Sequence, residues 1–214
     1  MSNSTYKVVD LFSGAGGISL GFEMPEKLNG LADLNYSDIG FDSKPFETIL
    51  AVEQDDYTAE TFRRNFNADV KEGDIREMNS FKRYSNADIV VGGPPCQGFS
   101  NLNSVKTEEL EDERNTLWRQ YMRVVEEVNP DVFLIENVPR FLKSEQGART
   151  VQIAEDLGYN TVVDNLWAHR YGVPQKRKRG FVIGSKIGIP FFPEELDEKI
   201  RTVENAFSGL PNEP

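Results

Sequence analysis

Short apolar runs rich in β-branched residues alternate along this chain with segments of helical periodicity, and this alternation constrains the fold more than any other feature. Strands are predicted over residues 7–12, 48–53, 88–93, 131–137, 160–168 and 180–185. Helical patterns follow a cap at Asp55 or Asp56, cover 117–128 before Asn129-Pro130, and cover 151–157 before Gly158. This order predicts an α/β fold with a mostly parallel sheet and helices on both faces.

Glycines and polar residues follow or end several of the predicted strands. They are residues 13–17, Glu53, residues 92–96 and Glu136-Asn137. In sheets of this kind ligands bind at the carboxyl ends of the strands. We therefore expect these four stretches to share one rim and to form the site.

The stretch "DLFSGAGGISLGF" (10–22) runs from a predicted strand through a small-residue turn into a helix. Such a turn lets backbone N–H groups approach a ligand. Gly14 and Gly16 fit the first two glycines of a dinucleotide fingerprint, but the third is missing. Glu53 is placed to accept ribose hydroxyls, and Asp74 to accept an adenine amino group. Together they favour an adenosine-containing cofactor without a pyrophosphate; the alternative is tight packing beside solvated acids.

The charge distribution argues against nucleic-acid binding by the whole surface. The 214 residues include 24 basic and 35 acidic side chains, a net charge of -11. Residues 89–107 contain no acid, however, and "HRYGVPQKRKRG" (169–180) carries five basic side chains and no acid. A polyanion site is expected where these two stretches meet.

Length and rare residues limit the class of protein further. We expect a single domain over 1–214 with a surface insertion at 24–47, where turn formers are dense. One cysteine, Cys96, and one histidine, His169, exclude an internal disulfide and make a metal site improbable. No apolar run could span a bilayer and no secretory signal is visible, so we expect no membrane partner and a cytoplasmic location.

The only cysteine lies in "GGPPCQGFS" (92–100), directly after Pro94 and Pro95. A lone cytosolic cysteine is most often a small buried apolar residue. Two prolines fix φ and remove two backbone donors, so this turn is pre-set to present Cys96 at a strand end. The setting therefore favours a nucleophilic thiolate.

Four motifs in order resemble those of the cytosine-5 DNA methyltransferases: "DLFSGAGG", "GGPPCQGFS", "ENV" (136–138) and "QKRKR" (175–179). "DERNTLW" (112–118) and "YGVPQKRKR" (171–179) extend the resemblance over nearly the whole chain. It implies a Rossmann-like fold dependent on S-adenosylmethionine, DNA as the partner, and a target cytosine flipped out of its duplex.

The resemblance also implies roles for particular residues. Cys96 would attack carbon 6 of cytosine, Glu136 would act at ring nitrogen 3, and Arg177 and Arg179 would contact the ring oxygen and backbone phosphate. Expected cofactor-binding residues are Phe12, Ser13, Gly14, Ala15, Gly16, Gly17, Glu53, Gln54, Asp74, Ile75, Pro94 and Leu117. Expected substrate-binding residues are Pro95, Gln97, Ser100, Asn137, Val138 and Gln175, with Asn137 also fixing its loop.

The family normally continues into a target-recognition region that nothing here resembles. We therefore expect a truncated catalytic part, or one half of a split enzyme that a second polypeptide completes. In a prokaryote it would be associated with the nucleoid. The alternatives are a tRNA cytosine-5 methyltransferase, a non-catalytic relative of the family, and a nicotinamide oxidoreductase, which the glycine spacing disfavours.

Overall fold

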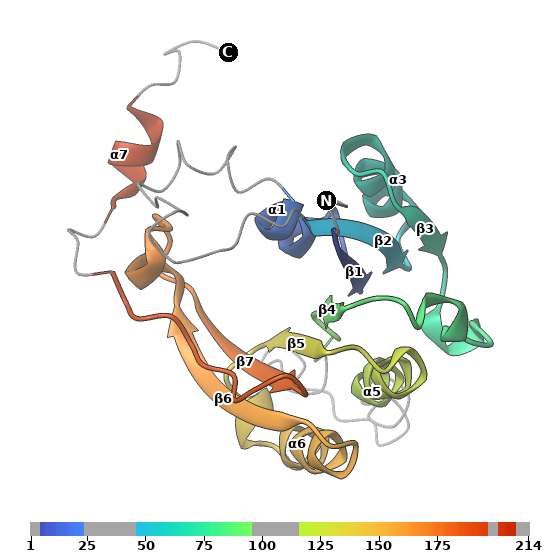
Figure 1. Cartoon of the computed structure of the whole chain (residues 1–214). Helices are drawn as coiled ribbons and strands as arrows, with labels where there is room; N and C mark the ends of the chain where they lie inside the picture. Colours follow the sequence, from blue (N-terminus) through green and yellow to red (C-terminus); the bar gives the residue numbers. More distant parts are fainter. Residues whose placement is uncertain (1–4, 24–45, 96–115, 197–200, 209–214) are drawn as a thin grey trace, which may run out of the picture.

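A computed structural model describes residues 5–23, 46–95, 116–196 and 201–208 (Figure 1). Its strands are β1 (Tyr6–Leu11), β2 (Phe46–Glu53), β3 (Asp69–Glu72), β4 (Ile89–Gly92), β5 (Val132–Asn137), β6 (Asn160–Trp167) and β7 (Lys178–Ser185). Its helices are α1 (Gly17–Glu23), α3 (Asp56–Asn65), α5 (Leu117–Val128), α6 (Glu145–Asp156) and α7 (Val203–Phe207). Short 3-10 helices are η2 (Ile75–Glu77), η3 (Lys82–Tyr84), η5 (Phe141–Lys143) and η6 (Ala168–Tyr171).

The described strands form one sheet in the order β3-β2-β1-β4-β5-β7-β6. The pairs among β3, β2, β1, β4 and β5 are parallel, whereas β7 is antiparallel to both of its neighbours. Parallel neighbours need a crossover, and helices from the alternating sequence supply it. The prediction of a mostly parallel sheet is confirmed, with β7 as the reversed strand.

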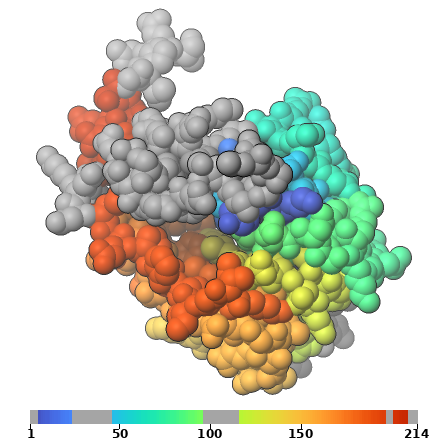
Figure 2. All heavy atoms as spheres, viewed as in Figure 1, coloured from blue at the N-terminus to red at the C-terminus, as the bar shows by residue number. Residues whose placement is uncertain are grey.

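Helices cover both faces of the sheet, as predicted (Figure 1). Successive residues of β2 point to opposite faces. Leu50 and Val52 pack into the large core formed with α5 and α6, while Ala51 packs against Phe62 and Phe66 at α3. In the space-filling view the β6–β7 side adjoins β5 and α5 without a break (Figure 2).

The glycine turn after β1 is shaped by the packing of α3. Gly16 has φ +95°, and a Cβ atom there would lie 2.3 Å from a ring carbon of Phe66. A larger residue would therefore push α3 away from the sheet. The glycine serves the core directly, whatever ligand the turn also approaches.

Local capping explains where the main helices begin and end. The Asp55 carboxylate accepts a hydrogen bond from the Thr58 N–H at 2.8 Å and starts α3. Helix α5 ends where Asn129 adopts a left-handed conformation (φ 53°) ahead of Pro130. Helix α6 begins earlier than its apolar pattern indicated, because the Ser144 hydroxyl caps it by accepting from the Gly147 N–H.

Some parts of the chain differ from the predicted pattern or lie outside the described residues. Strand β3 has the sequence Asp-Val-Lys-Glu, which has no apolar run, and α7 was not predicted. Most of the insertion expected at 24–47 lies outside the described ranges, and its last two residues already belong to β2. No helix within the described ranges has the length and apolar character needed to cross a membrane.

The next-to-last residue of β1, Asp10, is a buried acid that sequence reasoning did not single out. Its Oδ2 accepts a hydrogen bond from the Ser19 hydroxyl at 2.7 Å, and that hydroxyl accepts one from Thr48 at 3.1 Å. Its Oδ1 has no hydrogen-bond partner within the described part of the chain. Burial raises the pKa of Asp10 to about 7. The folded protein therefore holds this proton more tightly than the unfolded chain does.

We expect this acid to make stability depend on pH. The pKa of Asp10 is 3.8 in the reference state and about 7 when folded, so the contribution of Asp10 to the free energy of unfolding falls as pH rises between these values and levels off above pH 7. The isosteric D10N variant should lack this loss. The free energy of unfolding of D10N relative to wild type should therefore increase by on the order of 2–4 kcal/mol from pH 4 to pH 8, as measured by urea unfolding. The exposed variant D131N is the control, and a pH-independent gain in D10N would contradict ionisation of Asp10 as the cause.

Candidate active site

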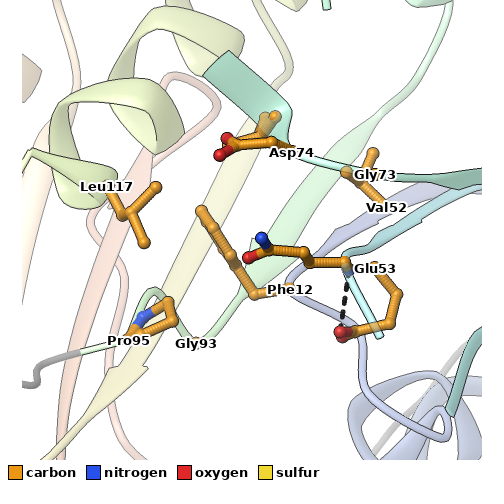
Figure 3. A pocket seen from close by; sticks show the side chains of 10 residues that line it. Phe12, Val52, Glu53, Gly73, Asp74, Gly93, Pro95 and Leu117 are labelled. Atoms are coloured by element: carbon orange, nitrogen blue, oxygen red, sulfur yellow. Dashed lines mark hydrogen bonds between the residues drawn. The ribbon is translucent and has the colours of Figure 1, made fainter. Parts of the chain in front are cut away.

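A cavity of about 160 Å³ opens at the carboxyl ends of β1, β2, β3 and β4. Its lining residues come from the ends of these strands and from the start of α5: Phe12, Val52, Glu53, Gln54, Gly73, Asp74, Ile75, Gly93, Pro95 and Leu117. Phe12, Leu117 and Pro95 surround it with apolar surface, while Asp74 turns its carboxylate toward it (Figure 3). The cavity thus combines flat apolar walls with carboxylate acceptors.

Glu53 holds the rim of this cavity together. Its Oε2 accepts the N–H of Gly14 at 2.7 Å, and its Oε1 accepts those of Gln54 and Asp55 at 2.8 and 2.9 Å (Figure 3 shows the Gln54 bond). The carboxylate therefore ties the glycine turn after β1 to the start of α3. Because each oxygen has two lone-pair directions, Oε2 can still accept from a ligand hydroxyl.

Phe12 adopts a backbone conformation that bulky residues rarely take. Its φ is +57°, in the left-handed region, although it carries a β-carbon. Such a residue costs free energy and tends to occur where a side chain must point in a particular direction. Here the conformation directs the ring to the cavity wall at the end of β1.

The turn after β4 is fixed by Asn137 at the end of β5. The Asn137 amide donates a hydrogen bond to the Pro94 carbonyl at 2.9 Å, and its oxygen accepts the Val138 N–H at 2.8 Å. Asn137 is only 5% exposed. This bond holds the double-proline turn from the neighbouring strand, which fits the expectation that Asn137 fixes a loop. Pro94 is buried and Pro95 is exposed toward the cavity.

An ion pair between Glu136 and Arg179 lies beside this turn. Arg179 Nε is 2.7 Å from Glu136 Oε1, and the two side chains are 23% and 27% exposed. A Cβ atom on Gly93 would lie 3.2 Å from Glu136 Oε2, so the glycine leaves the carboxylate its room. The cavity and the ion pair therefore meet at Gly93.

The reversal of β7 explains why Arg179 reaches Glu136. In the antiparallel register Glu136 is opposite Phe181. Arg179 lies two residues before Phe181 on β7 and therefore on the same face of the sheet as Glu136. The first residues of β7 consequently lie where β5 ends. The basic loop before β7 reaches the same rim as the carboxyl ends of the parallel strands.

The remaining expected residues fall into three groups. None of residues 13–17 lines the cavity: Ser13, Gly14, Ala15 and Gly16 form the turn beside it, and Gly17 begins α1. Gln175 and Arg177 are exposed on the loop before β7, and neither lines the cavity. Cys96, Gln97 and Ser100 lie outside the described residues. Within the described ranges, no group of three or more His, Cys, Asp or Glu side chains is placed to hold a metal ion.

Sequence reasoning missed two residues that line the cavity and two arginines that hold its wall residues. Val52 and Gly73 line the cavity, and Arg123 on α5 donates to the Ile75 carbonyl at 3.0 Å. Arg76 contacts the Asp74 carboxylate. The signal for Val52 and Gly73 was their position beside the expected acids, whereas the two arginines depend on how α5 and η2 pack.

The strand order, the reversed β7 and the cavity at the strand ends match the Rossmann-like fold of S-adenosylmethionine-dependent methyltransferases. The chain belongs to the C-5 cytosine-specific DNA methylase family, whose family model matches residues 6–207. This agrees with the resemblance seen in the motifs.

Three similar proteins illustrate the match. The chain is 35% identical to the Type II methyltransferase M1.HphI of Haemophilus parahaemolyticus, covering 95% of this chain and 52% of that protein. It is 32% identical to M.AquIA of Picosynechococcus, covering 96% and 89%. A crystal structure of a prophage-encoded E. coli protein, described as a DNA modification methyltransferase, has a TM-score of 0.71 and 31% identity, covering 97% and 56%. This chain thus spans about half of M1.HphI and most of M.AquIA.

The Asn137 bond yields a stability prediction. In N137D the side chain keeps its shape, but an ionised carboxylate cannot donate to the Pro94 carbonyl. The free energy of unfolding at pH 8 should fall by about 2–3 kcal/mol. The loss should be smaller at pH 5, because burial against the Pro94 carbonyl raises the pKa of the introduced carboxyl group, and its protonated form can donate again. Urea unfolding at both pH values measures this. The exposed variant N160D is the matched control, and equal losses in both variants would contradict the assignment.

Proposed function

We propose that this chain is the catalytic part of a DNA cytosine-5 methyltransferase of the restriction–modification kind. The observation that carries the proposal is the meeting, at Gly93, of a cavity with carboxylate acceptors and the Glu136–Arg179 pair, on the turn that leads to Cys96. A methyl donor and a base that must react with each other need such adjacent sites.

The cavity fits S-adenosylmethionine by the chemistry of its wall. Glu53 offers carboxylate oxygen to ribose hydroxyls, and Asp74 offers it to the adenine amino group. Phe12, Ile75 and Leu117 supply apolar surface for the purine ring. When bound, S-adenosylmethionine supplies the methyl group that carbon 5 of cytosine receives.

The chain's own residues would make cytosine reactive. Carbon 5 is too weak a nucleophile by itself, so the Cys96 thiolate forms a bond to carbon 6 and pushes an electron pair toward carbon 5. Glu136 shares a proton with ring nitrogen 3, and Arg179 steadies that carboxylate at 2.7 Å. After methylation the carbon 5 proton leaves to water or hydroxide, the carbon–sulfur bond breaks, and the thiolate is restored.

DNA is the proposed substrate. The family is defined by DNA methylation, and the similar prophage-encoded protein is described as a DNA modification enzyme, which favours DNA over the tRNA alternative. Exposed Lys176 and Arg177 stand on the loop before β7, at the same rim as Glu136, and suit phosphate contacts. If the source is a prokaryote, acting on chromosomal DNA would place the protein in the cytoplasm, associated with the nucleoid.

Recognition of the target sequence is proposed to come from outside these residues. M1.HphI is about twice as long as the region it shares with this chain, whereas M.AquIA is nearly matched in length. We propose that a second polypeptide, or a further segment, carries the recognition region, while residues 1–214 form a single catalytic domain.

Cofactor binding tests the first half of this proposal. Calorimetry should show that the chain binds S-adenosylmethionine and S-adenosylhomocysteine, and that E53Q weakens both about tenfold or more, because it removes the anionic acceptor. Glu72→Gln is the matched control, since Glu72 ends the neighbouring strand β3 but pairs with Arg63 and does not line the cavity. Wild-type affinity in E53Q, or no binding by the wild type, would refute the assignment.

A covalent adduct tests the second half. A DNA cytosine with fluorine at carbon 5 has no proton to lose in the final elimination, so the enzyme completed with its recognition region should remain attached to it. Denaturing electrophoresis should show the adduct only when S-adenosylmethionine is present. C96S should abolish it, and E136Q should slow it strongly while leaving cofactor binding intact. An adduct that survives C96S would remove Cys96 from the mechanism.

A further inference from the structure

Asp74 and Arg76 form a close pair on the wall of the cavity. Arg76 Nε lies 3.0 and 2.9 Å from the two carboxylate oxygens of Asp74, and Nη2 lies 2.5 Å from Oδ2. Asp74 is the more enclosed partner, with a side chain 16% exposed against 41% for Arg76. The guanidinium therefore binds the carboxylate from the solvent-exposed side. Asp74 itself faces the cavity (Figure 3).

The same residue holds the carboxylate in a second way. The backbone N–H of Arg76 donates to Asp74 Oδ1 at 2.9 Å and so caps η2. The cap alone engages one oxygen and leaves the carboxylate plane free to turn. The guanidinium engages both oxygens, and its planar fork sets that plane.

These contacts keep Asp74 an acceptor. Hydrogen bonds from Arg76 lower the pKa of Asp74 below its ordinary value, so the group is ionised at neutral pH. An ionised carboxylate can only accept hydrogen bonds. On a wall shared with the apolar Ile75 and Leu117, it favours a flat ring that carries an amino group and repels one that carries a carbonyl oxygen there.

We propose that Arg76 is a positioning residue that fixes the Asp74 carboxylate and thereby makes this cavity select a 6-aminopurine over a 6-oxopurine. The inference rests on the proposed cofactor and adds the residue that makes the cavity select the adenine of that cofactor. Asp74 would contact the purine, and Arg76 would act through Asp74.

The test compares two ligands on the full chain by calorimetry. One is S-adenosylhomocysteine, and the other is S-inosylhomocysteine, which has oxygen in place of the amino group. Wild type should prefer the adenosyl ligand by roughly tenfold or more, because the wrong ligand leaves the carboxylate facing an oxygen. R76A keeps the backbone cap, and it should lower this ratio at least several-fold by weakening the adenosyl ligand alone.

Two further variants separate positioning from general structural damage. R63A removes another exposed arginine–carboxylate pair, between Arg63 and Glu72. Neither residue lines the cavity, so this variant should leave the ratio of the two affinities unchanged. R76K keeps the positive charge but not the fork, so it should recover the ratio only in part. A complete wild-type ratio in R76K would overturn orientation by the fork.

A double-mutant cycle shows whether Arg76 acts through Asp74. If it does, adding R76A to D74A should change neither affinity. The inference would be overturned in favour of a structural role if R76A lowered the affinity for both ligands equally. It would also be overturned if R76A lowered the affinity for the adenosyl ligand as much in the D74A background as in the wild type. An R76A ratio equal to wild type would overturn it while leaving the cofactor proposal standing, whereas a wild type that binds neither ligand would defeat both.

Discussion

The Glu53 carboxylate is the contact on which the rest of the site depends. It lies at the end of β2 and accepts backbone N–H groups from Gly14, in the turn after β1, and from Gln54 and Asp55 at the start of α3. One side chain thus joins two neighbouring strand ends and the helix that follows. A charged acceptor with several donors is well satisfied even where water is partly excluded. The turn is therefore already in place before any ligand binds.

The two halves of the site are organised by different kinds of contact. The proposed cofactor side is built from acids held by nearby donors: Asp74 is bound by Arg76, and Glu53 accepts the N–H of Gly14. The proposed base side is built across strands: Asn137 on β5 holds the turn after β4, and Arg179 on β7 holds Glu136. The first arrangement gives an electronegative pocket, and the second stiffens a turn and fixes a carboxylate. Gly93 is the point where they meet.

Buried polar groups beneath the rim add a stability cost that the fold tolerates. Asp10 lies at the base of the glycine turn with one oxygen bonded to Ser19 and the other without a partner in the described residues. Large apolar clusters on both faces of the sheet offset such a cost. Charge repulsion from Glu53, which lines the cavity, adds to the effect of burial in raising the pKa of Asp10.

The sequence by itself determined most strands and helices and their alternation, the rim that carries Glu53 and Glu136, and the motifs that resemble the family, because periodicity, caps and turn residues are local properties. It did not reveal β3, whose four residues have no apolar run and are placed by pairing with β2 and by ion pairs from Arg63 and Arg83. Only the tertiary structure decided that β7 runs in reverse and brings Arg179 to Glu136. The ion pair of Arg76 with Asp74 and the hydrogen bond from Asn137 to the Pro94 carbonyl likewise became known only from the tertiary structure. Such contacts depend on where side chains point once the whole sheet has assembled, and no local pattern encodes that.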